Sequence, residues 1–112
     1  DNVEIKFRAS RDECHSSMSK AKVLLMTSNY ENYATCLIEG GLSGCAVASR
    51  EVWGVAHTVP GTSLFKPEDE PAILISYLAA SGPTMPREFW VKSFGTSGVR
   101  RRWEEFLRGK CK

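Results

Sequence analysis

The chain has 112 residues, enough for one domain with a single hydrophobic core. Its 42% hydrophobic and 25% charged residues are close to the average for globular proteins, which argues against a disordered chain. A formal net charge of +2 is too small to indicate nucleic acid or a membrane as the partner. The charge is uneven, because six basic residues and two carboxylates follow Gly98, which gives this end +4 and the rest −2. Any polyanion would therefore contact the C-terminal end.

The four cysteines contain no CxxC pair, and a core of this size does not require disulfides. We interpret them as reduced thiols of an intracellular protein. A zinc site is not expected, because the candidate ligands lack the usual spacing: Cys14, His15, Cys36 and His57. The sequence has no signal peptide and no apolar run long enough to span a bilayer. Because it begins at Asp1 without a methionine, we expect it to be a piece of a longer protein.

The N-terminal part predicts a strand, a connection and a second strand. Apolar and polar residues alternate from Val3 to Ala9, which is typical of a half-buried strand at a sheet edge. Arg11 to Lys20 is polar and is interpreted as a connection with a short helical piece. The run from Val23 to Met26 is apolar without alternation, so it predicts a strand buried on both faces in the middle of a parallel sheet.

A helix is predicted directly after this strand. Ser28 and Glu31 have the spacing of a capping box, in which each side chain bonds the backbone N–H of the other residue. Four apolar residues then share one helical face: Tyr33, Ala34, Leu37 and Ile38. The pair Gly40-Gly41 is expected to end the helix, because glycine readily takes the left-handed conformation found at helix ends.

The middle of the chain predicts two strands and a second helix. The strands are Cys45 to Ala48 and Trp53 to Val59. The stretch from Ala72 to Leu78, taken alone, fits either a helix or a strand. The acidic residues before it complement a helix dipole, and Gly82-Pro83 after it would end a helix, so we predict a helix here.

The C-terminal third predicts a short extended piece and two helices. Thr84-Met85 is extended, and a helix begins near Pro86. Its inner face carries Phe89, Trp90, Ser93 and Phe94. After a break from Gly95 to Gly98, a final amphipathic helix carries an apolar stripe of Val99, Trp103, Phe106 and Leu107. The order is therefore β-α-β-β-α-β-α, with an extra strand in front and an extra helix behind.

This order, together with particular residues, resembles the BRCT family, whose members are common in DNA-repair, checkpoint and chromosome-maintenance proteins. The run from Leu78 to Ser93, LAASGPTMPREFWVKS, is similar to the family's most recognisable stretch, and Trp90 matches its buried tryptophan. Gly40-Gly41 stands where the family has small residues after its first helix. Val55 to Val59 resembles the family's Thr-His-Val strand. The resemblance covers residues 21–94.

The resemblance implies a three-layer α/β/α fold with a central four-stranded, mainly parallel sheet, extended here by an extra N-terminal strand and an extra C-terminal helix. Residues 1–20 would form an N-terminal extension with an edge strand, residues 21–94 the BRCT-like core, and residues 95–112 the C-terminal amphipathic helix. Trp90, Gly40 and Gly41 would belong to the structural core. The implied function is a nuclear protein-interaction module in chromosome maintenance, the DNA-damage response or cell division, without catalytic residues or cofactors.

Many BRCT domains bind phosphorylated peptides through a Ser or Thr at the end of the first strand and the backbone N–H after it. The resemblance therefore implies a phosphate site at Thr27, Ser28 and Asn29. A helix N-terminus that follows a parallel strand favours anions in any case, because its N–H groups are free and its dipole is positive there. The family's lysine on the second helix is missing, since Leu74 stands at its position, and Lys66 is the nearest cation. The alternative is that Thr27 and Ser28 only cap the helix.

The basic residues Arg100, Arg101 and Arg102 leave a further choice. They fit the solvent face of the last helix, where Glu104 and Glu105 stand at i,i+4 spacing, or a contact with DNA or an acidic partner. Three hypotheses therefore stand. The domain recognises a phosphorylated peptide, or it is a phosphate-independent scaffold that binds through the appended strand or the C-terminal helix, or, as the least favoured hypothesis, it binds DNA. Other domains of the parent protein are further candidate partners, and a membrane is not expected.

Overall fold

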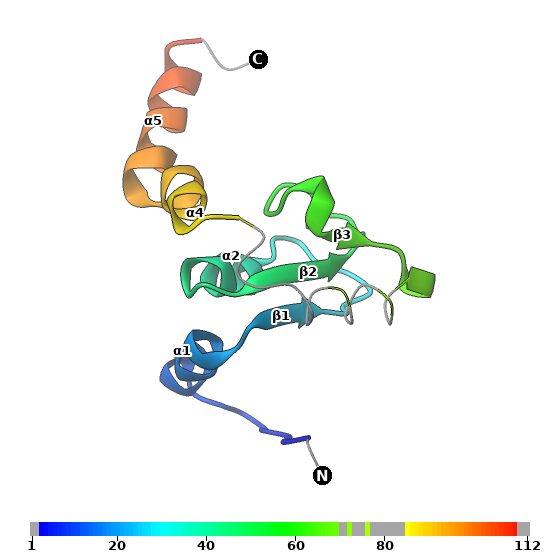
Figure 1. The fold of residues 1–112 in the computed structure, drawn as a ribbon. Helices are drawn as coiled ribbons and strands as arrows, with labels where there is room; N and C mark the ends of the chain where they lie inside the picture. Colours follow the sequence, from blue (N-terminus) through cyan, green and yellow to red (C-terminus); the bar gives the residue numbers. More distant parts are fainter. Residues whose placement is uncertain (1–2, 70–71, 73–75, 77–84, 110–112) are drawn as a thin grey trace.

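The computed structural model describes residues 3–69, 72, 76 and 85–109, which form an α/β domain around a parallel sheet (Figure 1). In this described part the sheet has three strands, in the order β1-β2-β3. They are β1 (Val23–Met26), β2 (Ala46–Arg50) and β3 (Leu64–Phe65). The described helices are α1 (Arg11–Lys20), α2 (Thr35–Leu42), α4 (Arg87–Phe94) and α5 (Thr96–Leu107), with 3-10 turns at Gly61–Ser63 and Pro67–Asp69. The predicted α/β class is confirmed.

The four-stranded sheet implied by the family resemblance does not appear among the described residues. Thr84 of the predicted fourth strand lies outside them, and Met85 lies in a bend. The helix predicted from Ala72 to Leu78 also lies outside them, except that Ala72 and Ser76 are both helical. The described residues therefore form an α/β domain with a three-stranded parallel sheet.

The strand β2, rather than β1, is the middle strand of the described sheet, which corrects the prediction for Val23–Met26. Ser49 aligns with Met26 of β1 on one side and with Leu64 of β3 on the other. Four successive residues of β2, Ala46 to Ser49, are buried, whereas only Met26 is buried in β1. The apolar run therefore identified a strand correctly, but the position of that strand in the sheet depends on its neighbours.

Residues 3–9 are not the edge strand that their alternation predicts. They lead away from the body of the domain and pair with no described strand (Figure 1). Three apolar side chains of this N-terminal arm are exposed: Val3, Ile5 and Phe7. Alternation marks a chain that suits a sheet edge, but a strand forms only where an edge accepts its hydrogen bonds.

The following helix, α1, replaces the predicted connection with ten helical residues. It begins with a capping box that the sequence analysis did not identify. The Ser10 hydroxyl accepts a bond from the Glu13 N–H (3.2 Å), and the Glu13 carboxylate accepts one from the Ser10 N–H (2.8 Å). The bond from the Ser10 N–H, followed by the Ser10 hydroxyl, holds the pKa of the Glu13 carboxyl below its usual value. An ion pair between Arg11 and Glu39 (2.9 Å) connects α1 to α2.

The helix α2 begins later than predicted, so the capping box assigned to Ser28 and Glu31 is wrong. Its N-cap is Ala34, and residues 27–34 form a loop. The backbone carbonyls of Glu31 and Asn32 lie against Gly54, so closely that a Cβ at Gly54 would overlap them. Gly54 also has a left-handed φ of +91°, which disfavours other residues. This contact with the turn at Gly54 keeps Glu31 and Asn32 in a loop, so α2 does not begin earlier.

The segment from Trp53 to Val59 forms successive turns instead of the predicted strand. The N–H groups of Thr58 and Val59 both donate to the Val55 carbonyl, at 2.8 and 3.3 Å. The turns bury Val55 and Val59 and leave Trp53 72% exposed. The third strand lies further along the chain, at Leu64–Phe65, where the sequence analysis placed no element.

The core lies where α2 packs between the sheet and α4. Its largest member, Trp90 of α4, is 0% exposed and lies edge-on to Phe89 and stacked against Phe94. Around it gather buried residues from the strands, α2 and the turns: Met26, Ala34, Leu37, Ile38, Cys45, Val47, Val55 and Val59. The predicted helix near Pro86 is thus confirmed, and its aromatic face is the one that enters the core.

Gly40 and Gly41 lie within α2 rather than ending it, so the prediction that they stop the helix is wrong. A Cβ at Gly41 would overlap the Trp90 indole, and a Cβ at Gly40 would lie 2.6 Å from Cδ2 of Leu24. The left-handed residue after the helix is Gly44, with φ +94°. The glycine pair is therefore a packing feature, because it lets α2 approach the tryptophan on one side and the sheet on the other.

The helix α5 follows α4 after Gly95 alone, so the predicted break ending at Gly98 is shorter than expected. Gly98 lies in the first turn of α5, against the carbonyl of Lys92. The rest of α5 projects from the domain as the orange-red helix in Figure 1. Among the described residues, no helix has the length and apolar content needed to cross a membrane.

Candidate functional site

The residues predicted to bind phosphate lie at one edge of the sheet. Thr27, Ser28 and Asn29 directly follow β1, and Lys66 directly follows β3. Because the strands are parallel, their carboxyl ends meet at the same edge. Thr27, Asn29 and Lys66 are exposed, and Ser28 is half-buried. This edge therefore offers accessible hydroxyl, amide and ammonium groups.

A cation that the sequence analysis missed lies at this edge. Arg50, the last residue of β2, donates from Nη1 to the Asn29 side-chain oxygen at 2.6 Å. The predicted strand stopped at Ala48, so nothing in the sequence pattern placed Arg50 beside the β1 loop. The parallel register supplies the reason, because it brings the ends of β1 and β2 together.

Two features oppose an anion site at the same edge. The helix α2 begins only at Thr35, so its N-terminal N–H groups do not directly follow Thr27 and Ser28. Exposed carboxylates flank the edge in the chain, at Glu51 after β2 and at Glu68 and Asp69 soon after β3. Leu74, the residue at the family's lysine position, lies outside the described residues. The edge thus carries charges of both signs.

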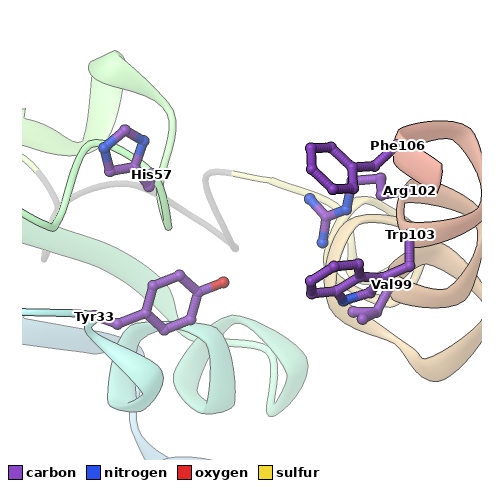
Figure 2. Close-up of a pocket in the computed structure, with 6 residues that line it drawn as sticks. All are labelled: Tyr33, His57, Val99, Arg102, Trp103 and Phe106. Carbon is purple, nitrogen blue, oxygen red and sulfur yellow. The ribbon is translucent and has the colours of Figure 1, made fainter. Parts of the chain in front are cut away.

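A different surface joins residues from three distant parts of the chain. The side chains of Val99, Arg102, Trp103 and Phe106 on α5 face Tyr33 and His57 across an open hollow (Figure 2). The hollow has a volume of about 490 Å³. We call it the α5 groove. Tyr33 comes from the loop before α2, and His57 from the turns that replace the predicted third strand.

The apolar stripe of α5 carries two neighbouring aromatic side chains that are mainly exposed. Trp103 is 60% exposed and Phe106 57% exposed, and Leu107 at the end of the stripe is also largely open to solvent. The Trp103 and Phe106 rings meet edge to face, with centroids 5.9 Å apart and an interplanar angle of 87°. Each ring therefore shields part of the other while the outward side of the pair stays uncovered.

Arg102 is held in position on the α5 side of this groove. Its Nη2 donates to the Ser93 carbonyl at 2.6 Å, and its guanidinium carbon lies 5.8 Å from the centroid of the Phe94 ring. The three arginines of the predicted basic cluster therefore differ in their surroundings. Arg101 pairs with Glu105 at 3.6 Å, as its i,i+4 spacing suggested, and Arg100 is exposed. Only Arg102 of the three lines the groove.

A second hollow continues from the α5 groove and shares His57 and Arg102 with it. It has a volume of about 370 Å³ and lies between the turns at residues 56–60 and the two C-terminal helices. Its other lining residues are mostly apolar: Ala56, Thr58, Val59, Pro60, Met85, Phe89, Ser93 and Phe94. The two hollows adjoin at His57 and Arg102, which line both of them.

In the described part of the chain, Cys36 and Cys45 do not have the features of reactive thiols, and no cysteine belongs to a metal-binding cluster. Burial, followed by the nearby Glu31 carboxylate, raises the pKa of the Cys36 thiol, and burial raises that of Cys45. A raised pKa leaves less of the reactive thiolate. Among the described residues no group of three or more His, Cys, Asp or Glu side chains is placed to hold a metal ion.

A scan against protein-family models, a search of curated proteins and a search of solved structures each found no match. The α/β fold therefore rests on its own geometry, and the resemblance to the BRCT family rests on the residues quoted for it.

Proposed function

We propose that this domain is a protein-interaction module that binds a segment of a partner protein in the α5 groove, without requiring phosphate. The observation that carries the proposal is the exposed aromatic pair of Trp103 and Phe106, facing Tyr33 and His57 across a ready-formed hollow. The nuclear setting implied by the family resemblance is part of the same proposal.

The energetics favour an external partner for this surface. Burying a large apolar side chain contributes roughly 2 kcal/mol, and α5 leaves three such side chains mainly in solvent: Trp103, Phe106 and Leu107. Contiguous apolar patches on monomers commonly mark interaction sites. The lining also has the composition of an interface centre, since Trp, Tyr and Arg are enriched among the residues that dominate binding energy.

The proposal is tested by selecting binders without assuming their sequence. A displayed library of short random peptides is panned on the intact chain, with Trp103→Ala as the counter-selection. We expect enriched peptides that bind the wild-type chain and lose binding on Trp103→Ala. Glu104→Ala is the matched control on the same helix, because Glu104 is exposed and does not line the groove. Peptides that bind all three proteins equally would sink the proposal.

A second candidate function, phosphopeptide binding at the sheet edge, has one observation in its favour. Arg50 places a guanidinium beside Asn29 and the Thr27-Ser28 loop, where the family resemblance calls for a cation. Guanidinium groups form strong charge-assisted bonds with phosphate. We rank this function second, because exposed carboxylates flank the edge and the α2 N-terminus is not adjacent to it.

An NMR titration with matched phosphorylated and unphosphorylated peptides separates the two candidates. Edge binding predicts shifts at Thr27 and Asn29 only with the phosphorylated peptide, reduced by Thr27→Ala. Groove binding predicts shifts at Trp103 with both. DNA binding through Arg100 to Arg102 gains no support from the geometry, since Arg101 is paired with Glu105 and only Arg102 of the three lines the groove.

A further inference from the structure

We infer that the segment bound in the α5 groove is acidic and carries bulky apolar side chains on either side of a carboxylate. This inference rests on the proposed function and names the chemistry of the partner. It follows from three properties of the groove: the sign of its charge, the fixed position of Arg102 and the continuation into a second hollow.

The polar groups that line the groove favour a negative ligand. The six described lining residues include one guanidinium, Arg102, one imidazole, His57, and one phenol, Tyr33, but no carboxylate. The second hollow shares the same two basic side chains and also has no carboxylate among its described lining residues. Complementary charge mainly sets which partner binds and how fast it associates. The lining therefore selects against basic segments and for acidic ones.

Arg102 is already held in a geometry suited to a carboxylate. One of its N–H groups donates to the Ser93 carbonyl (2.6 Å), and its guanidinium lies over the Phe94 ring. A guanidinium has five N–H donors, so the bond to Ser93 leaves donors that a carboxylate can use. Because the side chain is already ordered, binding loses less conformational entropy than it would with a free arginine.

The shape of the surface sets the order of groups in the ligand. The α5 groove is lined by Trp103 and Phe106, the second hollow is lined by Val59, Phe89 and Phe94, and Arg102 lines both. An elongated segment would therefore place apolar side chains in both hollows and a carboxylate between them. A compact anion such as free phosphate would leave both apolar hollows empty.

The chain's own N-terminal arm is a poorer occupant. It carries exposed apolar side chains, but its described charged residues are Glu4, Lys6 and Arg8, and Glu4 is paired with Lys6 at 3.5 Å. With Asp1 included, residues 1–9 hold two carboxylates and two cations, so the arm brings no net negative charge to Arg102. The same balance applies to the arm of a second copy of the chain.

The test uses peptides recovered by the Trp103-dependent selection, resynthesised in two altered forms. In one form every Asp and Glu becomes Asn or Gln, and in the other the largest apolar residue becomes Ser. Binding to the full chain is measured by calorimetry. We expect both changes to weaken binding by about tenfold or more, as the loss of a charge-assisted bond or a buried anchor does.

Variants of the protein then locate the charge recognition. Arg102→Gln should weaken binding of the acidic peptide by about tenfold and leave binding of its amide form nearly unchanged. Arg102→Lys should restore part of the lost affinity. Arg100→Gln, an exposed arginine of the same helix outside the groove, is the control. Circular dichroism verifies that each variant remains folded.

Failure of this inference and failure of the proposed function give different results. Trp103-dependent peptides that bind equally in acidic and amide forms overturn this inference and leave the proposed function intact. Absence of any Trp103-dependent peptide overturns both. A concentration-dependent dimer in sedimentation equilibrium, lost on Trp103→Ala, would show that a second copy occupies the groove and would also overturn the inference.

Discussion

Two neighbouring helices of this protein carry similar aromatic residues and place them in opposite environments. In α4 the Trp90 ring is fully buried and stacks on Phe94, with centroids 6.1 Å apart. In α5 the Trp103 ring meets Phe106 at a similar distance, 5.9 Å, yet both remain mainly exposed. Only Gly95 separates the two helices.

The difference comes from what lies opposite each helix. The aromatic face of α4 meets α2 at Gly41, where the missing side chain leaves room for the Trp90 ring. The aromatic face of α5 meets an open hollow, with Tyr33 and His57 on its far side. Amphipathic periodicity thus identifies a face that favours burial, and the tertiary structure determines whether the same chain or a partner covers it.

The largest expected effect is the stability contrast between the two tryptophans. Trp90→Ala should lower the free energy of unfolding by about 3–5 kcal/mol, because it leaves a large cavity in the core. Trp103→Ala should lower it by less than about 1 kcal/mol, because the ring is mostly in solvent. Urea denaturation followed by circular dichroism measures both. Equal losses would contradict the assignment of α5 as an uncovered surface.

The second expected effect concerns the glycine beneath Trp90. Gly41→Ala should destabilise the domain by about 1–3 kcal/mol, because the added methyl overlaps the indole ring, even though alanine is the better helix former. Gly61→Ala is the matched control, since a Cβ there meets no atom within 4 Å. A stabilised Gly41→Ala variant in thermal unfolding would show that α2 does not approach α4 as closely as described.

A smaller effect is expected from the hydrogen bond that Arg102 of α5 donates to the Ser93 carbonyl of α4. Arg102→Gln removes the bond to the Ser93 carbonyl and should lower stability by about 1 kcal/mol. Arg100→Gln, exposed on the same helix, should change stability by less than about 0.5 kcal/mol. Chemical denaturation compares the two variants. Identical curves would mean that the bond from Arg102 does not hold α5 against α4.

The smallest expected effect on stability concerns the cysteine thiols, which also differ between core and surface. The pKa values of Cys36 and Cys45 are raised, chiefly by burial, so we expect iodoacetamide to modify exposed Cys14 before either of them, as read by peptide mapping. Since the folded-state pKa values lie above those of the unfolded chain, the two thiols favour the folded state less as the pH rises above about 8.5. Faster labelling of Cys45 than of Cys14 in the folded chain would refute this.

Elements with strong local signals were predicted correctly from the sequence. The strand at Val23–Met26 and the helix after Pro86 are confirmed, and the strand predicted at Cys45 to Ala48 is β2, displaced toward Arg50. Predictions failed where a pattern needed a distant contact. Alternation in residues 3–9 had no sheet edge to join, and the capping pair at Ser28 and Glu31 is held in a loop against Gly54.

The candidate site was predictable only in its parts. The stripe of α5 was evident from its spacing, but nothing local indicated that Tyr33 and His57 would face it. His57 was expected in a strand, and it reaches the groove because residues 53–59 turn instead. Arg50 was missed at the sheet edge for a similar reason, since only the parallel register brings it to Asn29.

The sequence by itself determined the α/β class, the apolar strands and the amphipathic faces of the two C-terminal helices, because these depend on the spacing of neighbouring residues. The tertiary structure decided the order of the strands, the role of Gly40-Gly41 and the contrast between Trp90 and Trp103. These depend on which surfaces meet in space. Periodicity fixes the direction in which a side chain points along its own element, whereas burial depends on the packing of elements that the chain brings together from far apart.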